Sequence, residues 1–142
     1  MRTLLFLIII TVFWGLEISC RPAYAGSPNV EKGVLDGMVF VGHVGPKGGD
    51  ANGEDEVVFQ DGQFLSTSCS KYGFGSAPYT VSRKGNGIIF TAVTLSPKNG
   101  QIYWKGKVVG EKVVATYIWK KERWYWFDAN EESWLKAQLI KE

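Results

Sequence analysis

Five Asp-Gly or Asn-Gly pairs recur along the chain and constrain its fold more than any other feature. They are Asp36-Gly37, Asn52-Gly53, Asp61-Gly62, Asn86-Gly87 and Asn99-Gly100. Such pairs suit two-residue hairpin turns, because both residues tolerate a positive φ. The segments between them are rich in Val, Ile, Thr, Phe, Tyr and Trp, which favour strands. The sequence therefore predicts an all-β protein built from consecutive hairpins.

The turns divide the chain into short antiparallel strands. We expect them at residues 37–44, 55–60, 63–68, 79–83, 88–96, 101–109, 112–121 and 123–128, with a short strand or helix at 133–140. Sequential strands with tight turns favour an up-and-down barrel of about eight strands, which leaves no open edge. A sandwich is the alternative, although it would normally need longer crossover connections than the loops at 45–54 and 69–78.

The first 25 residues have the features of a secretion signal. Met1-Arg2 precedes an almost wholly apolar run from Thr3 to Leu16, and Ala23-Tyr24-Ala25 fits the small-x-small cleavage rule. The run is shorter than the ~20 residues that cross a bilayer. We therefore expect cleavage between Ala25 and Gly26, a periplasmic or secreted protein, and a single barrel domain over residues 26–142.

Cys20 offers another interpretation of this leader, as the lipid-bearing cysteine of a lipoprotein. A lipobox needs an apolar residue three positions before the cysteine, and that position holds Glu17. We therefore expect no lipid, and diacylglycerol on Cys20 in the purified protein would contradict this. Cleavage after Ala25 leaves Cys69 as the single thiol, which cannot form an internal disulfide. We expect Cys69 to be at least partly shielded.

The charge of the mature chain is close to balanced. Of 16 basic and 14 acidic residues, cleavage removes two and one, which leaves a net charge of +1. This balance does not favour a nucleic-acid partner, which would require a basic surplus. It gives no electrostatic reason for a membrane partner, and no second apolar run indicates a span in the mature chain.

The turn at Gly110-Glu111 fixes the register of one hairpin. One face of this hairpin is uncharged and the other carries lysines, so the uncharged face should point inward. The predicted inward pairs are Gly106 with Ala115, Trp104 with Tyr117, and Ile102 with Trp119. The turn at Asp61-Gly62 likewise pairs Phe59 with Phe64 and Val58 with Leu65.

The inner face alternates very large and very small residues. This alternation is typical both of a packed small barrel and of a pocket with aromatic walls, and both interpretations stay open. The candidate ligand-binding residues are Phe90, Ala92, Trp104, Gly106, Ala115, Tyr117 and Trp119.

The segment from residue 69 to residue 79 interrupts the hairpin rhythm. It contains two glycines and three aromatic residues, and we expect it to plug one barrel end or to gate a ligand entrance there. The candidate gating residues are Cys69, Tyr72, Phe74 and Tyr79.

Four consecutive aromatic residues, 124–127, lie within the stretch ERWYWFDANEESW. A strand here would place one aromatic pair on each face, Trp124 with Trp126 and Tyr125 with Phe127. We expect one pair to face the barrel interior. The C-terminal segment with Trp134, Leu135, Leu139 and Ile140 should cover the other pair, since an uncovered pair would form an exposed apolar patch.

The stretch GQIYWKGKVVGEKVVATYIWKK, residues 100–121, resembles wall hairpins of the calycin superfamily, which includes the lipocalins and avidin-like barrels. The resemblance extends over residues 88–127 and implies a barrel of the lipocalin type. The Gly-x-Trp signature of the first lipocalin strand is absent, because Gly37-Met38-Val39 has valine at the tryptophan position.

The sequence gives little support for catalysis or metal binding. His43 and Cys69 could pair as base and nucleophile, but nothing in the sequence brings them together. The acidic stretches 50–56 and 128–132 lack the EF-hand ligand spacing, and we expect solvated loops there. We therefore expect no enzyme, no metal site and no cofactor.

These features favour an exported barrel that binds a small, largely apolar molecule. The alternative is a non-enzymatic module that docks another envelope protein through its aromatic C-terminal region. An enzyme is the third and least favoured possibility.

Overall fold

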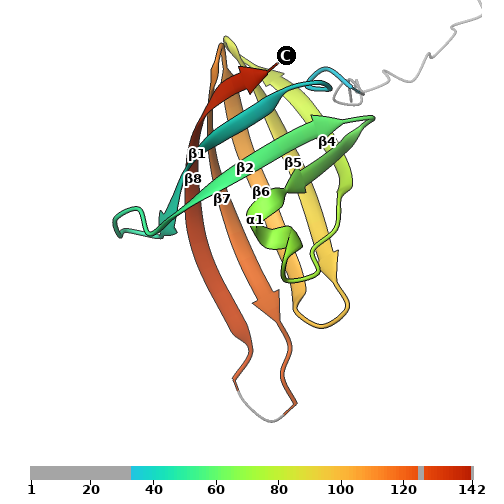
Figure 1. Cartoon of the computed structure of the whole chain (residues 1–142), viewed down its shortest axis with the longest axis vertical. Helices are drawn as coiled ribbons and strands as arrows, with labels where there is room; N and C mark the ends of the chain where they lie inside the picture. The colour runs from blue at the N-terminus through green and yellow to red at the C-terminus, as the bar shows by residue number, and fades with distance from the viewer. Residues whose placement is uncertain (1–32, 125–126, 142) are drawn as a thin grey trace, which may run out of the picture.

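The computed structural model describes residues 33–124 and 127–141, which form a closed barrel of eight antiparallel strands (Figure 1). Each strand pairs with the next in sequence and the last pairs with the first, which confirms the up-and-down barrel and rules out the sandwich. The expected signal peptide and Cys20 lie outside the described residues. The strands are β1 Val39–Pro46, β2 Gly53–Gln60, β3 Gln63–Ser66, β4 Ala77–Lys84, β5 Gly87–Ser96, β6 Gly100–Val109, β7 Lys112–Lys121 and β8 Ala129–Lys141, with the short helix α1 at Thr67–Ser70 after β3.

The two hairpin registers predicted from the turns are both confirmed. In the β6–β7 hairpin, Gly106 lies opposite Ala115 and Trp104 lies opposite Tyr117. In the β2–β3 hairpin, Phe59 faces Phe64 and Val58 faces Leu65. The turn between β2 and β3 has φ values of 51° at Asp61 and 72° at Gly62, as an Asx-Gly hairpin turn requires.

The third strand ends earlier than the sequence predicts. We expected a strand over 63–68, but β3 ends at Ser66 and α1 follows. The Ser66 side chain caps this helix, because its Oγ accepts a hydrogen bond from the backbone N–H of Cys69 at 3.3 Å. A serine side chain that accepts a hydrogen bond from a nearby backbone N–H competes with the hydrogen bonds between strands. Here that bond starts a helical turn.

The strand predicted at 123–128 is wrong for the described residues. Strand β7 ends at Lys121 and β8 begins at Ala129, so Trp124 and Phe127 lie in the connecting loop, 95% and 85% exposed. Tyr125 and Trp126 lie outside the described residues. The C-terminal segment is not a cover for this run. It is a wall of the barrel, with Leu135 fully buried inside.

Strand β8 closes the barrel because it pairs along both of its edges. It bonds to β7 over residues 112–121 and to β1 over residues 39–46. A segment that satisfies its backbone groups on both sides avoids an open edge, and this outweighs the local strand preference of the aromatic run. Figure 1 shows β8 as the long red strand between β1 and β7.

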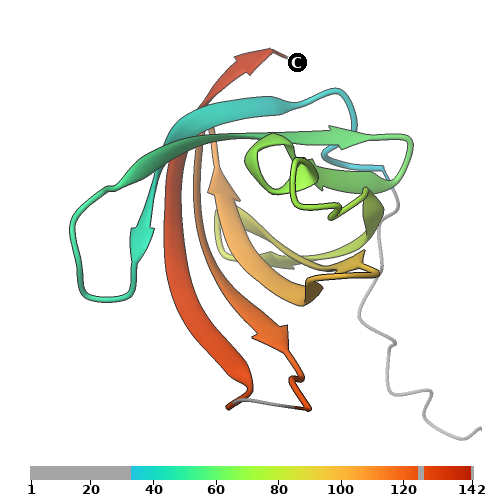
Figure 2. The ribbon, with the colours of Figure 1, turned by 60° about the horizontal axis from the view of Figure 1, so that its bottom comes forward.

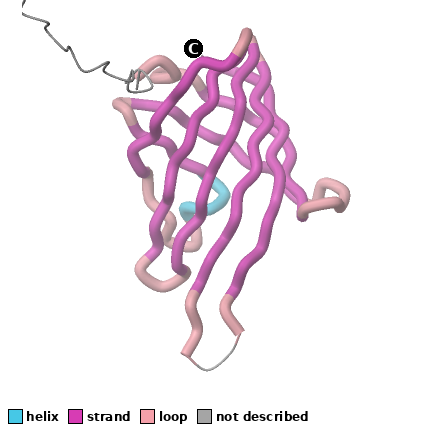
Figure 3. Tube along the Cα trace, turned by 180° about the vertical axis from the view of Figure 1, so that it is seen from behind, coloured by secondary structure: helices cyan, strands magenta, loops and turns pink. Residues whose placement is uncertain are grey.

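The two ends of the barrel differ. One end carries the tight turns at 61–62, 85–86 and 110–111, and we call it the turn end. The other carries the loops at 47–52, 71–76, 97–99 and 122–128 together with α1, and we call it the loop end. Figure 2 brings the loop end forward, and Figure 3 shows α1 at that end from behind.

An aromatic cluster fills the interior toward the turn end. Phe59 lies at its centre, with ring centroids 5.0 Å from Tyr79 and from Phe90 and 5.3 Å from Phe64. Leu35, from the segment before β1, is fully buried against this cluster. The cluster removes most of its apolar surface from water, which is the main stabilising contribution to such a fold.

Candidate functional site

A cavity of about 430 Å³ lies at the loop end of the interior, and we call it the lumen cavity. Strands β6, β7 and β8 form its wall, and α1 with the following loop closes the opposite side. Its lining residues are Cys69, Tyr72, Phe74, Asn99, Ile102, Tyr117, Trp119, Glu131 and Ser133.

The aromatic wall of the cavity continues the packed cluster. Trp104 stacks on Tyr117 with ring centroids 4.3 Å apart and an angle of 27° between the planes. Trp104 is buried, and its Nε1–H donates to Thr94 Oγ1 at 3.2 Å. Tyr117 is half-buried, so one side of this stack belongs to the core and the other faces the cavity.

The rim is held by hydrogen bonds to main-chain carbonyls. The Tyr72 carbonyl accepts from Ser96 Oγ at 2.9 Å and from Asn99 Nδ2 at 2.7 Å. The Asn99 carbonyl in turn accepts from Trp119 Nε1 at 2.6 Å. These three bonds connect the aromatic loop, the β5–β6 turn and the cavity wall, so the chain's own hydrogen bonds hold the rim together.

A buried carboxylate fixes α1 against the barrel. Asp55 on β2 is only 4% exposed, and it accepts from Ser66 Oγ at 2.6 Å and from the backbone N–H of Ser68 at 2.9 Å. Buried charges need such bonds to offset the loss of water. The expectation that 50–56 is a solvated loop is therefore wrong from Gly53 onward, where β2 begins, and Asp55 is a structural anchor inside the wall.

Two ionisable groups of the cavity have shifted pKa values. Burial raises the pKa of the Cys69 thiol above 9.0, and the nearby Asp55 carboxylate adds to this, while a Ser66 hydrogen bond opposes it. Burial also raises the pKa of Tyr117 above 10.0 against an opposing Ser133 hydrogen bond. Both groups are neutral at pH 7. Cys69 is half-buried, which confirms the expected shielding.

The structure divides the candidate residues into two groups. Tyr117 and Trp119 line the lumen cavity with the gating candidates Cys69, Tyr72 and Phe74. The other wall candidates lie in the packed core instead, and they are Phe90, Ala92, Trp104, Gly106 and Ala115.

Gly106 and Tyr79 show what the packed positions do. A side chain on Gly106 would collide with the Phe90 ring and come within 2.8 Å of the Ala115 Cβ, so these small residues leave no free space. Tyr79 lies away from the cavity. Its hydroxyl donates to Asp36 Oδ1 at 2.7 Å and accepts from the Leu35 N–H at 3.3 Å.

Sequence reasoning missed Glu131, Ser133 and Asn99 as lining residues. The expected solvated loop at 128–132 is wrong from Ala129 onward, because these residues begin β8. Alternation back from the buried Leu135 would have placed Ser133 and Glu131 on the inner face. No sequence pattern could have indicated Asn99 as a lining residue, because it lies in the turn between β5 and β6 and in no strand.

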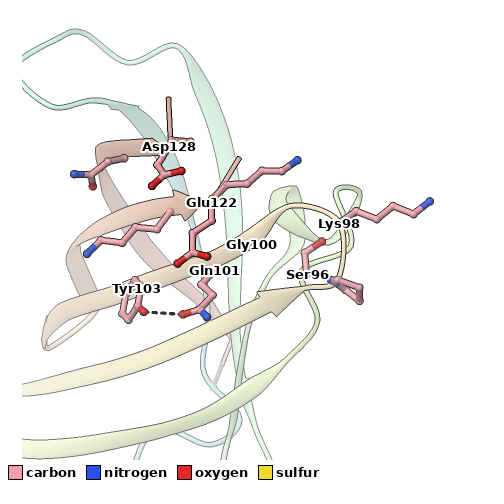
Figure 4. A pocket seen from close by; sticks show the side chains of 12 residues that line it. Ser96, Lys98, Gly100, Gln101, Tyr103, Glu122 and Asp128 are labelled. Atoms are coloured by element: carbon pink, nitrogen blue, oxygen red, sulfur yellow. Dashed lines mark hydrogen bonds between the residues drawn. The ribbon is translucent and has the colours of Figure 1, made fainter. Parts of the chain in front are cut away.

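A second hollow of about 560 Å³ lies outside the barrel, next to the β5–β6 turn and the ends of β7 and β8 (Figure 4). Its charged lining residues have both signs, with Lys98, Lys120 and Lys121 opposing Glu122 and Asp128. The Tyr103 hydroxyl donates to Gln101 Oε1 at 2.6 Å, the bond drawn in Figure 4. This hollow lacks the apolar walls of a typical small-molecule site, whereas the lumen cavity has them.

His43 and Cys69 do not form a catalytic pair in this structure. His43 points outward from β1, 64% exposed, with Nδ1 3.8 Å from Glu54 Oε1, whereas Cys69 lines the lumen cavity. Within residues 33–124 and 127–141 no three His, Cys, Asp or Glu side chains gather as a metal site would need.

No helix in the described part of the chain is long and apolar enough to cross a membrane. Comparison of the sequence and fold with protein-family models, with curated proteins and with solved structures gives no match.

Proposed function

We propose that this protein is an exported, lipocalin-like barrel that binds a small, largely apolar molecule in the lumen cavity. The observation that carries the proposal is a cavity with aromatic walls at the loop end of the barrel, next to the packed aromatic cluster. Its volume of about 430 Å³ lies in the range of about 300–1,000 Å³ that is typical of small-molecule sites.

The character of the lining supports an apolar ligand. Phe74 and Ile102 are almost fully buried, and together with Tyr117 and Trp119 they offer the ligand a mostly hydrocarbon surface. A ligand that covers this surface removes it from water, which contributes roughly 25 cal/mol per Å² of apolar area. The hydrogen-bonded rim lowers the entropic cost of binding, because the site is already ordered.

Binding of the neutral fluorophore N-phenyl-1-naphthylamine tests this proposal. We expect its emission to rise on binding to the wild-type protein. Ser133→Leu adds a bulky side chain inside the cavity and should weaken binding by about tenfold or more. Gln138→Leu, an outward position on the same strand, is the matched control and should bind as the wild type does. No binding by the wild type, or equal affinity in both variants, would contradict the proposal.

A second candidate is an envelope interaction module, and the exposure of Trp124 and Phe127 in the β7–β8 loop favours it. Exposed aromatic patches commonly mark protein partners. This candidate requires that the double variant Trp124→Ser/Phe127→Ser lose one specific envelope partner that cross-links to the wild type. It fails if cross-linking is the same for both proteins.

A further inference from the structure

The lumen cavity has one charged residue among its described lining residues, and that residue is the acidic Glu131. It lies on β8 directly opposite Trp119 of β7. Directly opposed residues on one face of an antiparallel pair have Cβ atoms about 5 Å apart. Glu131 is exposed, so it lies at the open mouth of the cavity, on the strand next to Trp119.

Within the part of the chain that the structure describes, the Glu131 carboxylate has no ion pair and no hydrogen bond. Its neighbour Glu132 behaves differently. Glu132 points outward and forms an ion pair with Lys47, with Nζ and Oε2 2.7 Å apart. One strand therefore carries two adjacent glutamates, one paired on the outside and one without a partner at the cavity.

The basic residues near the rim already have partners and are not among the lining residues. Lys71 Nζ lies 5.2 Å from the centroid of the Tyr72 ring, and Arg123 Cζ lies 5.8 Å from that of Trp119. Lys121 Nζ donates to Asn99 Oδ1 at 3.3 Å. Cationic side chains of the chain itself thus lie near the Tyr72 and Trp119 rings, within the distance at which a ring and a cation attract each other.

Four aromatic rings, those of Tyr72, Phe74, Tyr117 and Trp119, surround the same space as Glu131. The face of an aromatic ring attracts a cation, and several rings together are the usual binding site for organic ammonium groups. The aromatic rings and the Glu131 carboxylate at the cavity mouth thus both favour a positively charged group on the ligand.

We infer that the ligand of the lumen cavity is an amphipathic organic cation, with its apolar body between the aromatic walls and its cationic group near Glu131. This inference rests on the proposed binding function and adds the charge of the ligand to it. An amphipathic anion held by Lys71 and Arg123 is the competing ligand class, and the experiment separates the two.

The test measures how well three small probes displace N-phenyl-1-naphthylamine from the full mature protein. Phenyltrimethylammonium is the cation, tert-butylbenzene is its neutral isostere, and benzenesulfonate is an anion of similar size. We expect phenyltrimethylammonium to displace better than benzenesulfonate. Glu131→Gln should weaken phenyltrimethylammonium by about fivefold and change tert-butylbenzene by less than about twofold.

Two further variants control for the charge and its position. Glu131→Asp keeps the charge at the mouth and should keep the preference for the cation. Glu132→Gln removes the adjacent outward charge. It should leave the displacement of N-phenyl-1-naphthylamine by each of the three probes unchanged.

Two results overturn the inference and leave the proposed function standing. In the first, the naphthylamine binds but Glu131→Gln alters no probe. In the second, the wild type prefers benzenesulfonate, whether or not Arg123→Gln removes that preference. If the naphthylamine and all three probes fail to bind the wild type, the proposed function fails together with the inference.

Discussion

Single residues decide whether the inner face of this barrel is a core or a pocket. The alternation of large and small residues is compatible with both, and the choice depends on which neighbour occupies each gap. At Gly106 the gap is filled by the Phe90 ring, whereas at Ser133 it opens into the lumen cavity. The turn residues were enough to predict the pairing of Gly106 with Ala115. That the gap at Gly106 is filled could not be predicted from them, because it depends on the Phe90 ring of β5.

Overpacking at Ala115 should therefore destabilise the protein. Ala115 is 1% exposed and lies opposite Gly106, so Ala115→Leu has no space for its added carbons. We expect a loss of about 1–3 kcal/mol in the free energy of unfolding, measured by urea denaturation. Thr116→Leu, one residue along and exposed on the outer face, should lose much less. An unchanged midpoint for Ala115→Leu would show that this part of the interior is not filled.

At the scale of elements, the last strand was the least predictable part of the fold. Hairpins with two-residue turns could be read from the sequence, because the turn itself sets which residues face each other. The role of the C-terminal segment depends on β1, which lies far away in the sequence and offers an edge to be paired. The aromatic run at 124–127 has the stronger strand preference, yet its described residues Trp124 and Phe127 are in no strand, whereas the segment from Ala129 onward pairs with both β7 and β1.

The seam between β1 and β8 should be sensitive to a single added methyl group. A Cβ at Gly42 would collide with the backbone of Lys136 and Ala137, and backbone atoms cannot move aside as a flexible side chain can. We expect Gly42→Ala to lower the free energy of unfolding by on the order of 1–3 kcal/mol. Amide exchange relative to the wild type should accelerate more in β8 than in β5.

Gly75→Ala is a suitable control for this change, because a Cβ there meets no atom within 4 Å. Its free energy of unfolding and its amide exchange in β8 should match those of the wild type. If Gly42→Ala also matched the wild type, the close approach of the two strands would not be needed for closure.

At the scale of the whole molecule, three acidic side chains that are buried or half-buried share one direction of pKa shift. Burial raises the pKa values of Cys69, Tyr79 and Tyr117, and hydrogen bonding to Asp36 adds to the shift at Tyr79. The folded chain therefore holds these protons more tightly than the unfolded chain does. The stability this contributes is fully present below the unfolded values of 9.0 and 10.0. It is lost as the pH rises toward the folded values.

The free energy of unfolding should accordingly fall between about pH 8 and pH 10.5. Urea denaturation under reducing conditions at several pH values measures this slope. Tyr79→Phe removes the titrating hydroxyl with the largest of the three shifts and should flatten the slope. Tyr103→Phe, at an exposed position on the outer face, should keep the wild-type slope. Stability that is constant over this range would contradict the account of all three groups.

The pairing of β1 with β8 also sets the order in which strand pairs can form while the chain is made. Every other strand pair joins neighbours in the sequence and can form as soon as its hairpin has been made, whereas β1 must wait for residues 129–141. Until then both β1 and β7 present unpaired edges, the surfaces on which chains associate wrongly. A nascent or truncated chain that ends before Ala129 thus leaves these two edges open, whereas in the finished barrel β8 pairs with both of them.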